Sequence, residues 1–187
     1  MQIIDGKLVS KTIREELKEK IGQLKEKGKT LKLTVIIVGN NPASEIYVKN
    51  KSKACEEVGI VSETISLPEN ITQEQLENTI NETVNDKTVD GILVQLPLPK
   101  HLDSVAALKL IPPEKDVDGF SDENIGRLTL FSDEALFACT PHGMIKLLEY
   151  YNIPLEGKHA VVVGRSNIVG KPIALMLLKK DCTVNGR

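Results

Sequence analysis

The sequence predicts an α/β fold: an N-terminal α/β domain with a parallel sheet, followed by the start of a second, nucleotide-binding unit. Two observations predict the first domain. Short β-branched runs alternate with amphipathic stretches, and they follow one another as strand, helix, strand, helix, strand between residues 33 and 97. This order is typical of a parallel sheet with covering helices. The second unit is predicted because another strand, a glycine turn and a helix follow Gly157.

The first predicted element is an amphipathic helix over Lys7–Lys27, and Gly28 stands where its C-cap is expected. Apolar residues recur in it at intervals of four, four and three positions, which places them on one helix face. These residues are Ile13, Leu17, Ile21 and Leu24.

A buried strand, Leu33–Val38, comes next, because this short run is rich in β-branched residues and ends at a Gly-Asn-Asn-Pro turn. We expect Ser44 to cap a helix that continues to about Val58. Gly59 then ends that helix.

Two further runs, Ile60–Leu67 and Asp90–Pro97, complete the predicted sheet. Between them, Thr72 and Gln75 have the spacing of a capping box, in which each side chain bonds the other residue's backbone N–H. The inner face of the helix that follows consists of Leu76, Ile80 and Val84.

The pattern breaks up between Pro97 and about Thr140, where prolines and an acidic turn predict long ordered loops. Such loops often carry function on an α/β scaffold, although some only connect elements. Pro141 then suits the start of a helix. We expect the inner face of this helix to be formed by Met144, Leu147, Leu148 and Tyr151.

A domain boundary is expected that divides the chain into residues 1–150 and residues 151–187. The second part holds a strand at Ala160–Val163, a helix at Pro172–Lys180 and the opening of another strand at Thr183. One helix and so small a sheet cannot bury their apolar faces alone. Three explanations stay open: the sequence lacks residues, the protein is truncated, or a partner covers the exposed face.

Composition and charge narrow the class of protein. The 187 residues carry 24 Lys and Arg against 26 Asp and Glu, a formal charge of −2 that lacks the basic excess of nucleic-acid binders. No apolar run approaches the ~20 residues of a membrane span, and the start has no signal-type apolar core. The three cysteines are scattered along the sequence, which favours reduced thiols over a disulfide framework. We therefore expect a cytoplasmic protein that binds neither nucleic acid nor membrane.

Tyr47 and Lys51 are the first residues that can carry chemistry, because they lie four positions apart on one face of the predicted helix. A ring above a ligand and an amine one turn along can combine stacking with proton transfer, since burial disfavours a charged amine. The alternative is a solvated helix face, because Lys49 and Lys53 flank the pair.

Gln95 is expected at the carboxyl end of a parallel strand, where such sheets bind ligands, or else as an amide that caps the following loop. Asp116 and Asp118 alternate in an acidic turn. A carboxylate there can accept charge-assisted hydrogen bonds from paired N–H groups of a ligand, and a plain acidic turn is the alternative. We expect no metal site, because no companion ligands have suitable spacing.

A further candidate is the stretch Val163–Pro172, where a strand, a turn and a helix start favour phosphate binding. Only Gly164 and Gly170 are glycines in it, so it is not the GxGxxG motif. Arg165 can pair with a ribose phosphate, which favours NADP over NAD. The alternative is an ordinary strand–helix turn.

These segments, in this order, resemble the bifunctional methylenetetrahydrofolate dehydrogenase/methenyltetrahydrofolate cyclohydrolase family. The matching phrases are SEIYVKNKSKACEEVGI, GILVQLPLP, PEKDVDGF, CTPHGMIKLLE and KHAVVVGRSNIVGKP. The resemblance extends from IIDGK near the start to DCTV near the end. Each phrase alone is weak evidence, whereas five in order are specific together.

The resemblance implies an N-terminal folate-binding domain and a C-terminal Rossmann domain that binds NADP, with the active site in the cleft between them. Lys51 would be the main catalytic group, and Gln95 would tune its charge state and orientation. Tyr47 would stack on the pterin, and Asp118 would accept hydrogen bonds from the pterin's amino edge. The other residues implied are Thr140 and Pro141 for the substrate and Gly164, Arg165, Ser166 and Ile168 for the cofactor.

The implied enzyme is an oxidoreductase and hydrolase of one-carbon metabolism, which serves purine biosynthesis. It would oxidise 5,10-methylenetetrahydrofolate with NADP and hydrolyse the methenyl product to 10-formyltetrahydrofolate. Loss of hydride leaves a delocalised cation that needs orientation, whereas water addition and ring opening need proton movement.

The chain lacks the family's C-terminal part, so the alternatives are a truncated folate-binding protein without dehydrogenase turnover and another two-domain NADP dehydrogenase. A homodimer is implied if the nucleotide-binding domain is complete.

Overall fold

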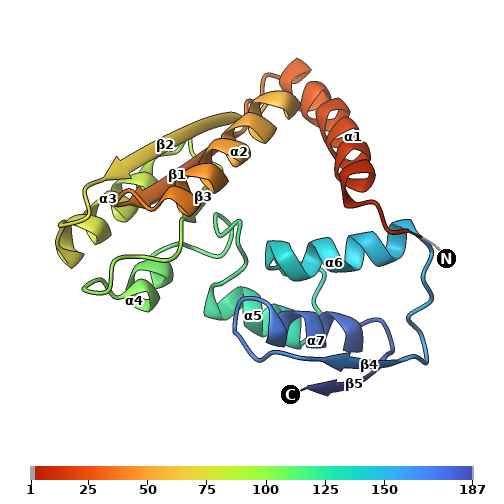
Figure 1. Cartoon of the computed structure of the whole chain (residues 1–187). Coiled ribbons are helices and arrows are strands. Elements are labelled where there is room, and N and C mark those ends of the chain that lie inside the picture. Colours follow the sequence, from red (N-terminus) through yellow and green to blue (C-terminus); the bar gives the residue numbers. More distant parts are fainter. Residues whose placement is uncertain (1–2, 187) are drawn as a thin grey trace. The chain divides into compact units, whose positions relative to one another are not determined.

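The computed structural model describes residues 3–186, which form two compact units (Figure 1). Residues 10–116 make up the N-terminal unit. The described residues up to Val9 and from Val117 onward make up the C-terminal unit. Two helices between residues 117 and 150 belong to the C-terminal unit because they pack on the last helix of the chain. The domain boundary expected at residue 150 stays a prediction.

A three-stranded parallel sheet with the order β2-β1-β3 lies at the centre of the N-terminal unit. β1 is the middle strand, and its residues Val35 and Ile36 are fully buried. Strands and helices alternate as the sequence predicts, which confirms the α/β class with a parallel sheet. The elements are α1 (Gly6–Glu26), which belongs to this unit from Ser10 onward, β1 (Lys32–Val38), α2 (Pro42–Val58), β2 (Val61–Leu67), α3 (Gln73–Asn85), β3 (Gly91–Val94) and α4 (Ser104–Lys109).

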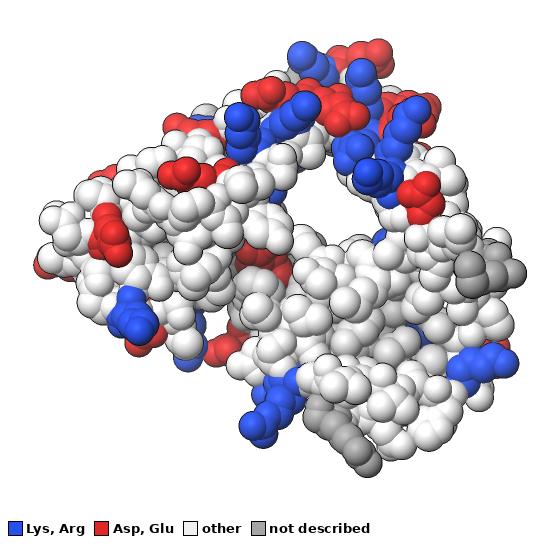
Figure 2. Space-filling view, in the orientation of Figure 1, with Lys and Arg blue, Asp and Glu red and all other residues white. Residues whose placement is uncertain are grey.

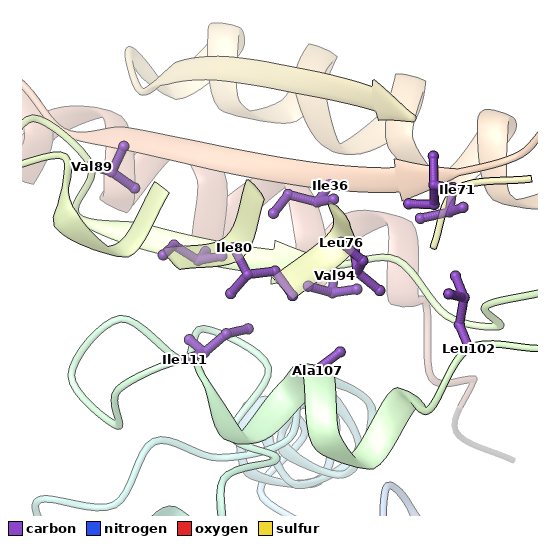
Figure 3. Close-up of a cluster of buried hydrophobic side chains, with 11 residues drawn as sticks. Ile36, Ile71, Leu76, Ile80, Val89, Val94, Leu102, Ala107 and Ile111 are labelled. Atoms are coloured by element: carbon purple, nitrogen blue, oxygen red, sulfur yellow. The ribbon is translucent and has the colours of Figure 1, made fainter. Parts of the chain in front are cut away.

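One face of this sheet packs against α3 and α4. Ile36 and Val94 of the strands lie in one cluster with Leu76 and Ile80 of α3 and with Ala107 of α4 (Figure 3). Full burial of a side chain of the size of leucine or isoleucine stabilises a fold by about 1.5–3 kcal/mol. This apolar layer therefore holds β1 and β3 in place, and with them the residue that follows β3.

The ends of α2 determine which way its side chains point. The N-cap is Asn41, whose side chain accepts hydrogen bonds from two amides of the first turn. Ser44, which we expected to be the cap, instead lies buried inside that turn. Asparagine caps as well as serine does, and here it directly precedes a proline that suits the first helical position. Gly59 ends the helix as predicted, with a left-handed φ of 90°.

The capping box predicted for α3 is present, with Thr72 and Gln75 bonding each other's backbone N–H groups. Such a box satisfies two of the amides that a helix start leaves without partners. The inner face of α3 is also as predicted, because Leu76 and Ile80 are fully buried and Val84 packs against the same cluster.

The C-terminal unit contains a parallel pair of strands, β4 and β5. Their inward residues Ala160 and Val162 pack in one apolar cluster with Ile173 and Met176 of α7. On the opposite face, Val161 of β4 is 63% exposed. The elements are α5 (Asp122–Thr129), α6 (Cys139–Tyr150), β4 (His159–Val162), α7 (Gly170–Leu178) and β5 (Thr183–Gly186).

The region between Pro97 and Thr140 is more regular than the sequence predicts, because it contains α4 and α5. These helices have six and eight residues, too few to establish an apolar period. In α6 the expected inner face is corrected at one position. Ile145 is 3% exposed, whereas Met144 is 41% exposed.

Charged side chains of both signs gather over α1 on the face that Figure 2 shows. Lysines and glutamates are interspersed along this helix, so it presents a mixed surface rather than a patch of one sign. Within residues 3–186 no helix combines the length and the apolar character that crossing a membrane requires.

Candidate functional site

Lys51 and Gln95 meet at the carboxyl end of the sheet in the N-terminal unit. Gln95 follows β3, and its backbone N–H donates to the Ile36 carbonyl at 2.8 Å, which anchors it to β1. Its side-chain Oε1 accepts a hydrogen bond from Lys51 Nζ at 3.2 Å. Its Nε2 donates to the Leu96 carbonyl at 2.7 Å. The Leu96 carbonyl therefore holds the nitrogen end of the carboxamide and leaves the oxygen end for the lysine.

Tyr47 lies one helical turn before Lys51 on α2, and its side chain is 63% exposed. The flanking Lys49 and Lys53 are exposed as well, whereas Lys51 is half-buried and bonded to Gln95. This difference separates Lys51 from the solvated lysines around it. The helix thus offers an accessible aromatic ring and a constrained amine on neighbouring turns, as the four-residue spacing predicts.

Cys55 lies one turn beyond Lys51 on the same helix. Burial raises the pKa of the Cys55 thiol, and the neighbouring Glu56 carboxylate raises it further. Because the thiolate is the reactive form of cysteine, this residue is unsuited to be a nucleophile near neutral pH. The amine of Lys51 is therefore the better candidate on α2 for moving a proton.

A hollow of about 270 Å³ lies at the carboxyl ends of β1 and β3. Gly39 and the cap residue Asn41 line it on the side of β1, and Pro97 and Pro99 line it after β3. The carboxyl edge of a parallel sheet is where α/β proteins commonly bind ligands. Gln95 lies two residues before Pro97 along the chain, so its carboxamide lies at the same edge of the sheet as the hollow.

Asp118 lies in the C-terminal unit, together with the residues that begin α6. The Cys139 thiol lies 3.6 Å from the Val117 carbonyl and 4.0 Å from Asp118 Oδ1. Thr140 follows as an exposed residue, and Pro141 is buried in the first turn of α6. Three residues implied by the resemblance are therefore brought into one neighbourhood within this unit. A half-buried carboxylate there can accept hydrogen bonds from a ligand's amino groups.

The turn between β4 and α7 is held closed by its own contacts. Ser166 Oγ accepts hydrogen bonds from the Val169 and Gly170 amides at 3.1 and 3.2 Å. A Cβ on Gly170 would lie 2.5 Å from the carbonyl carbon and oxygen of Gly164, so only glycine permits this close approach of backbones. Because these two amides already donate to Ser166, they are not open to a phosphate. Phosphate binding at this helix start therefore stays a prediction, and it would have to use donors of the turn other than these two amides.

Arg165 and Ile168 are exposed on this same turn. Ser166 keeps its hydroxyl proton for donation, since the two amides use only its oxygen as an acceptor. A guanidinium beside a hydroxyl donor is suited to a phosphate monoester. The donor set therefore fits a ribose phosphate better than a pyrophosphate, which would need the engaged amides.

Sequence patterns did not single out two groups that the structure places beside these residues. One is the Leu96 carbonyl, which is a backbone group and leaves no trace in residue type. The other is Asn124 of α5, which is fully buried and bonded to the segment before α6. Its only signal in the sequence is an amide at the third position of a short helix. Among the described residues no group of three or more His, Cys, Asp or Glu side chains could hold a metal ion.

Two family models match the chain. Residues 4–118 match the model described as "Tetrahydrofolate dehydrogenase/cyclohydrolase, catalytic domain". Residues 138–186 match that of the NAD(P)-binding domain of the same family. The chain belongs to the tetrahydrofolate dehydrogenase/cyclohydrolase family. The resemblance found in the sequence phrases is thereby confirmed.

Curated relatives of this family resemble the chain over nearly its whole length. The Bifunctional protein FolD of Chloroherpeton thalassium is 51% identical over 190 residues, which cover 98% of this chain and 65% of the relative. That of Maridesulfovibrio salexigens is 56% identical over 180 residues, covering 96% and 63%. The chain thus spans less than two thirds of the length of these relatives.

Solved structures of the family share the fold. A bifunctional FolD methylenetetrahydrofolate dehydrogenase/cyclohydrolase from Campylobacter jejuni matches with a TM-score of 0.98 and 53% identity, covering 100% of this chain and 66% of that one. The enzyme from Trypanosoma brucei, complexed with NADP cofactor and inhibitor, matches with a TM-score of 0.95 and 38% identity. These alignments cover 99% of this chain and 63% of the trypanosomal one.

Proposed function

We propose that this chain acts on tetrahydrofolate-bound one-carbon units. The reactions are the NADP-dependent oxidation of 5,10-methylenetetrahydrofolate to the 5,10-methenyl form and the hydrolysis of that form to 10-formyltetrahydrofolate. The hydrogen bond from Lys51 to Gln95 carries the proposal, because it constrains an amine at the carboxyl edge of a sheet that matches the family's catalytic domain. The family match does not favour a dehydrogenase of a different class.

Lys51 is the proton-transfer group of the proposed hydrolysis. Water adds to the methenyl carbon, the bond from that carbon to N5 breaks, and one proton is released overall. The hydrogen bond to Gln95 holds the Lys51 amine in place at this edge, where it is able to take up and return that proton. Gln95 accepts one N–H of the amine, which leaves the remaining positions of the nitrogen for water and substrate.

Four further residues bind the substrate in this proposal. Tyr47 stacks on the pterin, for which its exposed ring is suited. Asp118 accepts hydrogen bonds from the pterin's amino edge, each worth about 1.5–3 kcal/mol when one partner is charged. Thr140 and Pro141 contact the folate beside it. These residues all precede position 150, so residues 1–150 carry the folate-binding function.

Residues 151–187 begin the NADP-binding domain in this proposal. Arg165 and Ser166 contact the 2′-phosphate, and Gly164 and Ile168 lie against the cofactor. When bound, NADP supplies the hydride acceptor. The chain's own part is to bind and orient, as the exposed guanidinium and the Ser166 hydroxyl are suited to do. Support also comes from the NADP bound to the trypanosomal relative.

A cytoplasmic location and a homodimer formed through the nucleotide-binding domain complete the proposal. Cell fractionation tests the first of these, and the second is tested by sedimentation of the purified chain over a range of concentrations.

The variant Lys51→Met tests the catalytic assignment. Loss of a general acid–base group typically lowers the rate about 10²–10⁴-fold, and we expect this loss in methenyltetrahydrofolate hydrolysis. The matched control is Lys49→Met, which removes an exposed lysine from the same helix and should leave the rate unchanged. The measurement is the decay of the methenyl chromophore with enzyme in excess.

An unchanged rate in Lys51→Met would refute the role of Lys51. A chain that binds tetrahydrofolate tightly but does not accelerate hydrolysis would instead be the binding protein without turnover.

A further inference from the structure

Gly119 brings two segments of the C-terminal unit into direct backbone contact. It is buried, with a φ of 64° that favours glycine. A Cβ at this position would lie 2.5 Å from the Leu136 carbonyl oxygen and 2.9 Å from the Ala138 nitrogen. Backbone atoms cannot move away from such a clash as a flexible side chain can. The turn that carries Asp118 therefore rests against the peptide groups just before α6.

Asn124 holds the same segment from another direction. Its side chain has no exposed surface, and its Oδ1 accepts a hydrogen bond from the Leu136 N–H at 3.2 Å. Its own backbone N–H donates to Oγ of Ser121, the N-cap of α5, so Asn124 lies in the capped first turn of that helix. Loss of the carboxamide would leave the Leu136 amide without this buried acceptor, which destabilises that arrangement. Asn124 thus fixes where the segment Leu136–Cys139 runs.

The far end of that segment contacts Asp118 itself. The Cys139 thiol lies against the Val117 carbonyl and 4.0 Å from Asp118 Oδ1. The segment is therefore bonded to Asn124 at Leu136, packed on Gly119 in its middle, and in contact with the carboxylate at Cys139. A displacement of Leu136 would therefore change the position of Cys139, three residues further along the segment, and with it the contact to Asp118.

We propose that Asn124 is a positioning residue that aims the Asp118 carboxylate through the segment Leu136–Cys139. The inference rests on the proposed function, in which Asp118 accepts hydrogen bonds from the pterin's amino edge. Hydrogen bonds weaken steeply when donor and acceptor are misaligned, so an acceptor for a planar ligand edge has to be held in direction as well as in place. Asn124 touches no reacting atom in this scheme and acts only through the segment.

The test compares tetrahydrofolate with its 2-desamino analogue, which lacks the amino group that Asp118 is proposed to bind. Dissociation constants are measured by calorimetry for the unsubstituted chain, Asn124→Ala and Gly119→Ala. We expect the unsubstituted chain to prefer tetrahydrofolate by about 10–100-fold, the range for one charge-assisted hydrogen bond. Both variants should bind tetrahydrofolate about tenfold more weakly and lose most of that preference.

Matched control variants distinguish a loss of the orientation of the Asp118 carboxylate from a general loss of structure. Gly126→Ala adds a methyl group on α5 with nothing within 4 Å, and Asn78→Ala removes an exposed amide from α3. Both should keep the full preference for tetrahydrofolate. In an Asp118→Ala background, Asn124→Ala should change the affinity for tetrahydrofolate no further, because both residues act on the same hydrogen bonds. A purely structural role of Asn124 would weaken both ligands equally.

Hydrogen exchange in the unsubstituted chain gives a second measurement if a variant does not fold. Coupling between two sites is reciprocal, so a ligand that engages Asp118 should slow exchange at the Leu136 amide. Tetrahydrofolate should do this, and the 2-desamino analogue should not. An equal preference in the unsubstituted chain and in Asn124→Ala, or equal protection by both ligands, would overturn the inference. A chain that binds neither ligand would overturn the proposed function itself.

Discussion

Arg165 lies on the turn that leads into α7, and Lys171 lies in the first turn of that helix. The two positively charged side chains differ in what they contact. Lys171 Nζ donates to Asn167 Oδ1 at 2.7 Å, so it braces the turn from within. Arg165 is exposed, next to the serine that closes the turn. A guanidinium presents a planar set of donors that matches a phosphate, whereas an ammonium acts as a point charge. Discrimination between the two nicotinamide cofactors is therefore expected to depend on Arg165.

Substitution of Arg165 by alanine should weaken NADP binding by about 10–100-fold, because a charge-assisted pair to the 2′-phosphate is lost. NAD lacks that phosphate, so its affinity should change little. Calorimetric titration of both cofactors measures the ratio. Lys171→Ala is the control, since it removes a positive charge from the first turn of α7 and should leave the ratio unchanged. Equal losses for NADP and NAD in Arg165→Ala would mean that the residue does not recognise the phosphate.

At the scale of elements, an ion pair that responds to pH joins α6 to the segment that follows α7. Glu149 of α6 accepts from Lys180 Nζ at 2.7 Å and from Lys146 Nζ at 3.0 Å. The hydrogen bond from Lys180 lowers the pKa of the Glu149 carboxyl below its ordinary value of 4.5, and Lys146 adds to the effect. The unfolded chain therefore binds this proton more readily than the folded chain does. The pair stabilises above about pH 4.5, and this contribution is lost as the pH falls through the lowered pKa.

Glu149→Gln should remove that dependence. Partly exposed pairs contribute about 0.2–1 kcal/mol, so the loss at neutral pH should be of this size. Urea unfolding between pH 7 and pH 3 should show the difference between the unsubstituted chain and Glu149→Gln shrinking as the pH falls. Glu156→Gln, at an exposed carboxylate, serves as the control. A difference that stays constant across this range would exclude a titrating ion pair as its cause.

The elements that the sequence predicts are those whose signals are local. α1 and α3 are long enough to repeat their apolar positions, and β1 is marked by a β-branched run between turns. α4 and α5 were missed, because a short helix is stabilised by its caps and by packing rather than by a visible period. The cap of α2 was misassigned because Asn41 and Ser44 are both good capping residues, and the proline after Asn41, which suits the first helical position, was not weighed.

In the candidate site, too, local sequence patterns predict some features and not others. Tyr47 and Lys51 could be paired from sequence, since their spacing alone places them on one helix face. The bond from Lys51 to Gln95 joins residues 44 positions apart, and no local pattern predicts such a contact. It was expected only through the resemblance to the family. The sequence likewise does not reveal that two amides of the turn at Ser166 already have an acceptor.

At the scale of the whole molecule, the two units have separate apolar clusters. The first includes Ile36, Leu76 and Ile80, and the second includes Ile145, Ile173 and Met176. A cavity in one cluster removes contacts from that cluster alone, because packing interactions act over a few ångströms. A substitution that makes a cavity in one cluster should therefore lower the local stability of that unit and leave the other unit largely unchanged.

The variant Ile80→Ala tests this expectation. Its side chain is fully buried, and loss of a buried isoleucine costs about 2–5 kcal/mol. Hydrogen exchange followed by mass spectrometry should show faster exchange in β1, β3 and α3, while peptides from α7 and β4 change little. Val105→Ala, at an exposed residue of α4, is the control. Equal acceleration throughout residues 3–186 would show that the two clusters unfold together.

The closed turn before α7 has one more consequence. A loop whose amides have no partner before a ligand binds becomes ordered only on binding. The conformational entropy that the loop loses then weakens the complex. Here the Ser166 side chain has already done the ordering, and Gly170 lets the two backbones rest against each other in advance. A ligand that binds this turn meets an arrangement that is already formed. Selectivity among similar ligands would therefore depend on the exposed side chains of the turn rather than on how easily the loop can rearrange.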